Sequence, residues 1–455
     1  MQRAPIFFRI LIVLGSYGLF LSPRLYGESL DLQQAISEAL DHSPQIKAAA
    51  GQVEIARWKR IEALSGYLPV ISISSNYLTN KKYLETDIAL PGATAPVSMP
   101  QIIPTTLWTA NAQLGIFDGF STTNRTLAAA DFKSSADLNH EWRKFQLERE
   151  ITIQFYRALA AKELQSVAIQ NEKNLLDHLN DIKVRKGVGL STHYDVLRVE
   201  VQTSEAKSEV INADDNLQMA RLKLAELMGA DISEQNQEQR IPAGELPEVG
   251  ADVTNEPLGA RPAGRKDLQS LQLRVDGMEK STAALGRHLF PRLSLFAQYQ
   301  YYNNLNDSPT DTASFRRAFS TGISFNWILF DGFSSTARAY QSLSEKNELE
   351  QNLNARRLKA IVDIQFWRRK YSYFNALYSA RTREIGKSEE SLRLARVGQR
   401  EGTRTSSDLL DAQSELFRSK AGAINAQLGS TEAFLNLEMA TGKPIKSKSG
   451  NSVHE

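Results

Sequence analysis

The chain has 455 residues, and its 54 Lys and Arg residues against 52 Asp and Glu residues leave a net charge of +2. This balance gives no indication of nucleic-acid binding, which usually shows as a strong basic bias. The absence of cysteine excludes disulfides, thiolate metal sites, a cysteine nucleophile and a lipidated cysteine.

Residues 1–27 are typical of a secretory signal peptide. Arg3 and Arg9 precede the apolar run ILIVLGSYGLFL, and small residues follow near Gly27. The run is short for a spanning helix, which needs about 20 residues. An N-terminal membrane anchor is the alternative, but we expect a mature chain that leaves the cytoplasm.

The next part, residues 28–229, combines helices and alternating strands. Residues 29–65 have a helical pattern, and Pro69 ends it. The segment that follows predicts a strand at 70–79, a loop rich in Pro and Gly at 80–104 and a second strand at 105–117. Two helices without Pro or Gly in their interiors are then expected at 121–186 and 195–228. At 1.5 Å per residue, the longer helix would extend about 100 Å.

The same order of elements then returns. An irregular linker, 230–264, precedes a second unit, 265–442, and a C-terminal tail covers 443–455. The second unit predicts two strands and two long helices: 292–302, 316–330, 334–397 and 404–441. Five residue pairs are each separated by 213 positions (331 − 118 for the first): Asp118 and Asp331, Gly189 and Gly402, Asp195 and Asp408, Leu197 and Leu410, Gly229 and Gly442. The chain therefore contains an internal duplication.

The four predicted strands alternate apolar with small polar residues. This pattern is typical of transmembrane β-barrel strands, although a half-buried sheet packed on helices is the alternative. Four aromatic residues fit a membrane girdle: Tyr77, Trp108, Tyr301 and Trp327. Four strands cannot close a barrel, and open edges are not tolerated in hydrocarbon, so several chains would share one barrel. Three chains with twelve strands are a natural closed solution.

Each second strand leads into a long helix through a turn, IFDGFSTT at 116–123 and LFDGFSST at 329–336. Gly119 and Gly332 permit a sharp reversal after Asp118 and Asp331. We expect Ser121 and Ser334 to be the N-caps of the helices that follow.

In this order, these motifs resemble the TolC-like outer membrane factor family. The resemblance covers about residues 30–442, and it also includes Leu68-Pro69, Phe290-Pro291, GLSTHYDVL (189–197) and GTRTSSDLLDAQ (402–413). It implies a helix-dominated fold with transmembrane β-structure and a two-fold internal repeat. Four strands per chain would contribute to a trimeric 12-stranded outer-membrane β-barrel, and the long helices to a periplasmic α-barrel.

The resemblance also implies a function and partners. The homotrimer would be a passive exit duct of a tripartite efflux or type I secretion system in a Gram-negative type envelope. It would contact outer-membrane lipid and dock onto a periplasmic adaptor and an inner-membrane transporter of the RND, ABC or MFS type. The linker and the tail would form a belt around the helical tunnel.

Candidate functional residues lie at the two helix turns. The resemblance places Asp408 and Asp411 at the periplasmic pore constriction, where a ring of carboxylates would attract cations. Compensation of the helix dipole is the alternative for these residues. The glycines of the turns, Gly187, Gly189 and Gly402, end helices. The resemblance implies in addition that the adaptor docks at these helix-turn tips, which also include Thr403.

Arg404 resembles the family arginine that links neighbouring helices in the closed state, with Asp195 as its candidate partner. A solvated surface arginine is the alternative. The tyrosine that often precedes this arginine by five positions is replaced here by Gln399.

Catalysis has no support in the sequence. The six histidines show no metal-ligand spacing, and neither a GxSxG nor a Walker A motif is present, so we expect no enzyme activity, no cofactor and no metal. A periplasmic coiled-coil scaffold remains the alternative function, but it would leave four amphipathic strands without a role.

Overall fold

The computed structural model describes residues 30–79, 84–88, 91–92, 95, 97–101, 104–229, 242–247, 264–305 and 308–445. The expected signal peptide lies outside these residues, as do most of the linker 230–264 and of the tail 443–455. Most of the expected belt thus lies outside the described residues.

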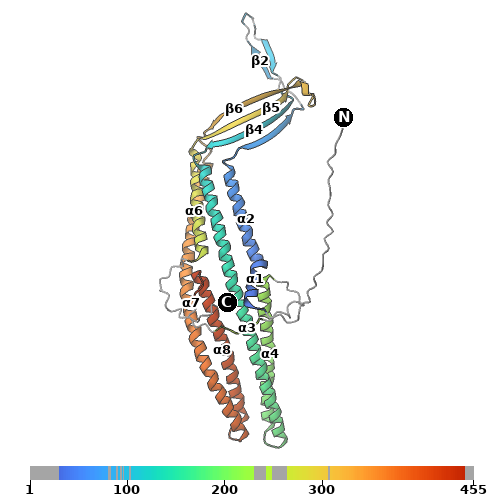
Figure 1. Ribbon diagram of the computed structural model, residues 1–455, viewed down its shortest axis with the longest axis vertical. Coiled ribbons are helices and arrows are strands. Elements are labelled where there is room, and N and C mark those ends of the chain that lie inside the picture. Colours follow the sequence, from blue (N-terminus) through green and yellow to red (C-terminus); the bar gives the residue numbers. More distant parts are fainter. Residues whose placement is uncertain are drawn as a thin grey trace.

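Long helices extend from one end of a narrow, curved sheet (Figure 1). The helical part consists of α1 (Leu32–His42), α2 (Pro44–Ser65), α3 (Ser121–Gly187), α4 (His193–Met228), α6 (Lys266–Gly286), α7 (Ser334–Arg400) and α8 (Ser406–Thr441). Helices α3 and α7 have 67 residues each, and α4 and α8 have 36 each. The long helices of the two halves therefore match in length and order, whereas α1 has no counterpart among the described residues of the second half. No helix in the described ranges has the length and apolar character needed to cross a membrane.

The sheet consists of β1 (Val70–Tyr77), β4 (Thr106–Phe117), β5 (Arg292–Asn303) and β6 (Phe315–Asn326), antiparallel and in that order. The first hairpin pairs Ile73 with Ala110, and the second pairs Leu295 with Ile323. Adding 222 to the number of Ile73 gives Leu295, and adding 213 to that of Ala110 gives Ile323, so the two pairs are equivalent positions of the two repeats. The duplication thus preserves the strand register as well as the order of elements.

Register divides the sheet into two chemically different faces. One face is largely apolar and carries Ile73, Ala110, Leu295, Ile323 and their neighbours two positions away on each strand. The other carries mainly small polar residues such as Ser72, Asn111, Gln298 and Ser320. Apolar side chains on the first face are strongly exposed, with Ile73 at 74% and Ile323 at 68%.

Two details of the sheet differ from the sequence-based expectation. The segment expected as an irregular loop, 80–104, contains a small antiparallel hairpin, β2 (Leu84–Ile88) and β3 (Val97–Gln101). Pro100 lies inside β3, and this residue usually marks a strand end or an edge. Strand β6 ends at Asn326 and not near 330, so Trp327 lies just beyond it.

The expected N-caps Ser121 and Ser334 are wrong, since both are the first residues of their helices. Phe120 and Phe333 occupy the cap positions with φ values of 65° each, and neither caps through its side chain. Instead, Asp118 Oδ2 accepts hydrogen bonds from the amide and hydroxyl of Thr122, and Asp331 Oδ2 accepts one from the amide of Ser335. The aspartates of the two turns thus satisfy free amides of the first helical turn.

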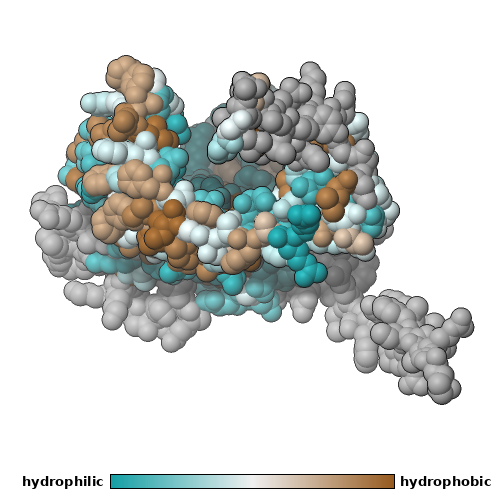
Figure 2. Space-filling view, turned by 90° about the horizontal axis from the view of Figure 1, so that it is seen from above, coloured by the Kyte–Doolittle hydropathy of each residue, from teal (hydrophilic) through white to brown (hydrophobic). Residues whose placement is uncertain are grey.

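The largest apolar core lies about halfway along the helices. Helix α1 packs there against α3 and α4 through residues such as Ala35, Ile151 and Leu159, and Leu435 of α8 belongs to the same core. Seen from above, the molecule is a curved wall around a hollow whose visible lining is largely hydrophilic (Figure 2). A single chain thus forms an open arc rather than a closed solid.

Candidate functional site

The two helix turns lie together at the end of the molecule far from the sheet (Figure 1). Residues 188–192 connect α3 to α4, and residues 401–405 connect α7 to α8. Gly189 has a φ of 77° and Gly402 a φ of 79°, a backbone conformation that favours glycine. Gly187 is the last residue of α3, and Thr403 bonds back to the Gly398 carbonyl. We call these two turns the tips.

Each tip begins its second helix with the same capping box. Thr192 Oγ1 accepts a hydrogen bond from the Asp195 amide at 3.1 Å, and Asp195 Oδ2 accepts one from the Thr192 amide at 2.9 Å. Thr405 and Asp408 form the same two bonds at 3.1 and 2.9 Å. Reciprocal bonds of this kind satisfy two amides at a helix start.

These bonds influence the charge of both aspartates. Hydrogen bonds from the backbone and side chain of Thr192 hold the pKa of Asp195 below its ordinary value, and Thr405 does the same for the pKa of Asp408. Arg404 adds a weaker attraction for Asp408. Both carboxylates are therefore ionised and are used, at least in part, to cap their helices.

Asp411 has a different environment. It lies on the exposed surface of α8, one turn after Asp408. The described part of the chain supplies it with no hydrogen bond or ion pair. Of the two candidate constriction residues, Asp411 is the one whose carboxylate is free to face a solute.

Within one chain, Arg404 and Asp195 do not pair in the described residues. Arg404 packs beside Gly398, where an added Cβ would lie 2.6 Å from its Cγ. Its amide bonds to the Gly398 carbonyl. A link between Arg404 of one copy and Asp195 of another stays a prediction.

Two other contacts join the tips. Arg185 of α3 donates to the carbonyl of Gln399 at 3.2 Å, and His178 Nε2 lies 2.9 Å from Ser406 Oγ in a hydrogen bond. Leu410 of α8 completes the contact by packing among α3 and α4 residues. These links could not be predicted from the sequence, because their partners are more than 200 positions apart and share no motif.

At the other end of the molecule, the aromatic residues expected in a girdle form two levels. Trp108 pairs across strands with Tyr301 near the outer end of the sheet, and Tyr77 lies there on β1. Tyr301 also stacks on Phe315 at 4.6 Å. Trp327 lies at the opposite end and donates from Nε1 to the Leu289 carbonyl. Their contact with lipid stays a prediction.

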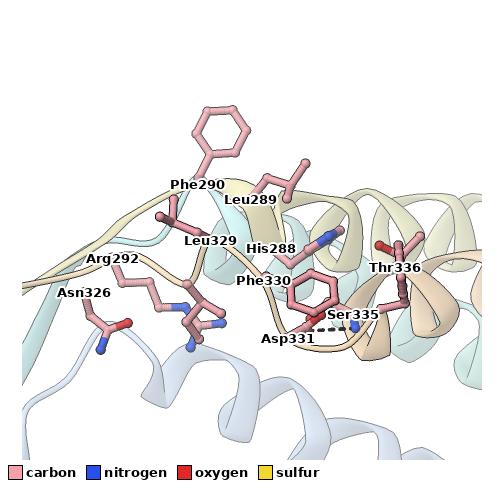
Figure 3. Close-up of a pocket in the computed structure, with 12 residues that line it drawn as sticks. His288, Leu289, Phe290, Arg292, Asn326, Leu329, Phe330, Asp331, Ser335 and Thr336 are labelled. Carbon is pink, nitrogen blue, oxygen red and sulfur yellow. Dashed lines mark hydrogen bonds between the residues drawn. The ribbon is translucent and has the colours of Figure 1, made fainter.

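The strand-to-helix turns form the boundary between sheet and helices. Phe117 meets Phe120 edge to face at 5.8 Å, and Phe330 meets Phe333 in the same way at 5.3 Å. Beside the second turn lies a cavity of about 200 Å³ lined by residues that include His288, Phe290, Arg292, Asp331 and Ser335 (Figure 3).

The described residues contain no group of three His, Asp or Glu side chains that could hold a metal ion. The arrangement is suited to guiding solutes, since a largely hydrophilic surface lines the hollow of the open arc (Figure 2).

Comparisons with known proteins give a consistent result. A family model described as "Outer membrane efflux protein" matches residues 35–230 and 262–443. "Outer membrane protein TolC" of Vibrio cholerae is 22% identical over 432 residues, covering 93% of this chain and 92% of that protein. The protein of the same name from Escherichia coli is 22% identical over 436 residues, covering 90% and 82%.

Solved structures share the fold. The outer-membrane channel OprN has a TM-score of 0.75 at 18% identity, covering 92% of this chain and 93% of that one. The CmeC outer membrane channel of Campylobacter jejuni has a TM-score of 0.77 at 14% identity, covering 92% and 87%.

Proposed function

The chain belongs to the outer membrane efflux protein family, and from this premise we propose that three copies form a passive exit duct through the outer membrane. As a member, it is an outer membrane protein with a large periplasmic part. The apolar face of the sheet would meet lipid, and the polar face would line the lumen. The long helices would enclose a tunnel through the periplasm.

The observation that carries this proposal is the repeat geometry of one chain. Strand β4 of the first repeat pairs with β5 of the second, whereas β1 and β6 are the two edges of the sheet. Because the repeats have the same form, β6 of one copy can meet β1 of the next as β4 meets β5. When the rotation that relates one copy to the next returns to the first copy, repeating this contact closes a ring. A closed ring leaves no strand with an unpaired edge.

The contacts of the turns support this assembly. A Cβ on Gly119 would lie 2.6 Å from the Cβ of Phe290, so the first turn packs tightly on the second repeat. Gly332, its counterpart, has nothing within 4 Å in the same chain. The 222-position offset makes Leu68 the counterpart of Phe290. Leu68 is 63% exposed, and we propose that Leu68 of the next copy covers Gly332.

The tips would be the regulated end of the duct. Docking of an adaptor and an inner-membrane transporter would favour an arrangement in which the inner helices are further apart. Transport would be driven by these partners, and the duct itself would perform no catalytic step. A coiled-coil scaffold is less consistent with the molecule, because it gives no use to a sheet with one exposed apolar face.

Reconstitution of the purified full chain into planar lipid bilayers tests the proposal. We expect discrete ion conductance, together with a trimer on gels whose migration changes after heating. Recovery of the protein only as a monomer that neither enters carbonate-washed membranes nor conducts ions would refute the duct.

A further inference from the structure

Four arginines gather where the sheet meets the helices. Arg125, Arg287, Arg292 and Arg338 line a cavity of about 70 Å³, which shares lining residues His288, Arg292 and Ser335 with the larger cavity in Figure 3. We call these four arginines the junction cluster.

The cluster is built by both repeats. Arg125 and Arg338 are 213 positions apart, and each is the fifth residue of a long helix, α3 or α7. Arg292 is the first residue of β5, and Arg287 begins the short 3-10 helix before it. The same strand-to-helix turns that connect the two parts of the fold therefore bring the four arginines to one cavity.

The positive charges of the cluster are not neutralised by ion pairs. Within the described ranges, none of the four arginines forms a salt bridge with a carboxylate. Asp118 and Asp331 lie beside the cavities, but each binds amide groups of its own helix start. Four arginines against these two aspartates leave two positive charges per chain.

Two of the guanidinium groups are held in place by neutral partners. Arg338 donates from Nη2 to Ser334 Oγ at 3.0 Å, and the Arg287 guanidinium lies over the Phe290 ring at 5.5 Å. Neither contact consumes the positive charge. Guanidinium groups suit the binding of phosphate and carboxylate, because their planar donors match two oxygens at once.

The direction of Arg292 shows which side of the sheet the cluster serves. Arg292 pairs across strands with Asn326, on the polar face. In Figure 3, Arg292 and Asn326 extend to one side of the strand ends, whereas Leu289 and Phe290 extend to the other. If the polar face lines the lumen, as proposed above, then the cluster lies in the lumen where the barrel passes into the helical tunnel.

We propose that the junction cluster binds oxyanions, namely the phosphate or carboxylate groups of anionic solutes that pass through the lumen. This inference rests on the proposed duct, and it adds a class of favoured cargo. Three copies would place the clusters in one ring, so that their fields add at the same level of the passage. An anionic lipid headgroup offers the same chemistry, but it would approach from the apolar side, opposite to Arg292.

Ion selectivity of the full-length channel tests the proposal. The variant Arg125→Gln/Arg292→Gln/Arg338→Gln is compared with wild type in bilayers under a KCl gradient. We expect the ratio of anion to cation permeability to fall about threefold, because field focusing in a narrow passage raises the local anion concentration. The control is Arg57→Gln/Arg381→Gln/Arg393→Gln, whose arginines pair with Glu54, Glu384 and Glu390 on helix surfaces. It should keep the wild-type ratio.

A binding measurement separates this proposal from the duct itself. Inorganic phosphate is titrated into the detergent-solubilised full chain and followed by phosphorus NMR, which requires no conductance. We expect affinity to fall roughly tenfold in the cluster variant. If wild type conducts no ions but this loss is seen, the duct fails and the oxyanion site stands. Equal phosphate binding and an equal permeability ratio in wild type and variant would overturn the site.

Two further measurements complete the test. If the cluster variant does not fold, Arg292→Gln alone replaces it, because this exposed residue lies at a strand start. Native mass spectrometry from phosphatidylglycerol nanodiscs detects a bound lipid. Loss of such a lipid in the variant, with an unchanged permeability ratio, would assign the cluster to the membrane and refute a lumenal site.

Discussion

Arg185 near the end of α3 donates a hydrogen bond from Nη1 to the main-chain carbonyl of Gln399 near the end of α7, at 3.2 Å. This bond joins the two helical hairpins of one chain beside their tips. The carbonyl acceptor makes the link independent of the side chain at position 399. The absence of a tyrosine there therefore leaves the tips connected.

Arg185→Met should loosen the tips, because methionine keeps most of the aliphatic packing but removes the donor. A hydrogen bond from a charged group is worth roughly 1.5–3 kcal/mol when buried, and less at an exposed site. We expect larger mean conductance in bilayers. The control is Lys183→Met, which removes an ion pair with Glu200 inside a single hairpin. Equal conductance of Arg185→Met and wild type would show that this bond does not restrain the tips.

The second link between the tips should make them sensitive to pH. Burial lowers the pKa of His178, Arg185 and Arg396 add to this effect, and Asp181 opposes it. When the tip opens, the imidazole can take up a proton near its ordinary pKa of about 6.5. The open state then binds more protons than the closed one, so the stability of the closed tip is fully present above about pH 6.5 and declines as pH falls towards the lowered pKa.

Hydrogen exchange at the tips tests whether the closed tip loses stability as the pH falls. Amides of α3 and α8 around His178 and Ser406 should exchange faster at pH 5.5 than at pH 7.5, after correction for the intrinsic rate. His178→Gln can still hydrogen-bond to Ser406 but cannot titrate, and it should remove the difference. The same pH dependence in this variant would assign it to other groups.

The repeat geometry predicts how neighbouring copies pair. Within one chain, Ala112 of β4 lies opposite Ala297 of β5. Phe325 is the repeat counterpart of Ala112 (112 + 213), and Ser75 is the counterpart of Ala297 (297 − 222). We therefore expect Phe325 of one copy to lie opposite Ser75 of the next. Directly opposite residues have Cβ atoms about 4.5–5.5 Å apart, close enough for a disulfide after small adjustments.

Ser75→Cys/Phe325→Cys should therefore give covalent dimers and trimers on denaturing gels, and a reductant should convert them back to monomers. The chain has no native cysteine, so no other disulfide interferes. The matched control is Ser74→Cys/Phe325→Cys, in which the first side chain points to the opposite face of the sheet. Equal cross-linking of both variants, or none in either, would contradict the predicted register.

Valine substitutions at the two turn glycines should have different effects, although the sequences of the two turns are nearly identical. Gly119 and Gly332 have φ values of 69° and 68°, so valine strains the backbone at either position by about 1–3 kcal/mol. Gly119→Val also collides with Phe290 of the same chain. We expect both variants to lower trimer yield without changing ion selectivity, with the greater loss of folded protein in Gly119→Val. Normal trimers with altered selectivity would assign the turns to the pore.

Much of this fold could be predicted because local signals are strong. Glycine and proline are absent from the interior of α3, and the 213-position spacing relates its turn to that of α7. The hairpin β2–β3 could not be found, because Pro100 and the surrounding glycines and prolines hide its alternation. The capping role of Asp118 was also missed. A serine at a helix start is a common N-cap, and only the backbone conformation shows that Phe120 occupies that position.

The candidate site was less accessible to sequence reasoning. His178 and Ser406 meet only because two long hairpins pack side by side, and neither belongs to a motif. The junction cluster did leave a signal, since Arg125 and Arg338 obey the same 213-position spacing as the turn residues. That spacing could indicate equivalent places, but only the fold adds Arg292 from a strand and Arg287 from the segment before it.

Asp408 and Asp411 should separate the structural and the conducting roles at the tip. Asp408 closes a capping box with Thr405, whereas Asp411 is exposed one turn later. Asp411→Asn should therefore reduce the preference for cations and the block by added multivalent cations, with no change in the thermal stability of the trimer. Asp408→Ala should instead speed hydrogen exchange at the start of α8, since the Thr405 amide and hydroxyl both lose the carboxylate that accepts their hydrogen bonds. Because Asp411 and the junction arginines bear opposite charges, Asp411→Asn and the arginine variant should shift the permeability ratio in opposite directions. A shift in the same direction would show that the two sites do not act along one passage.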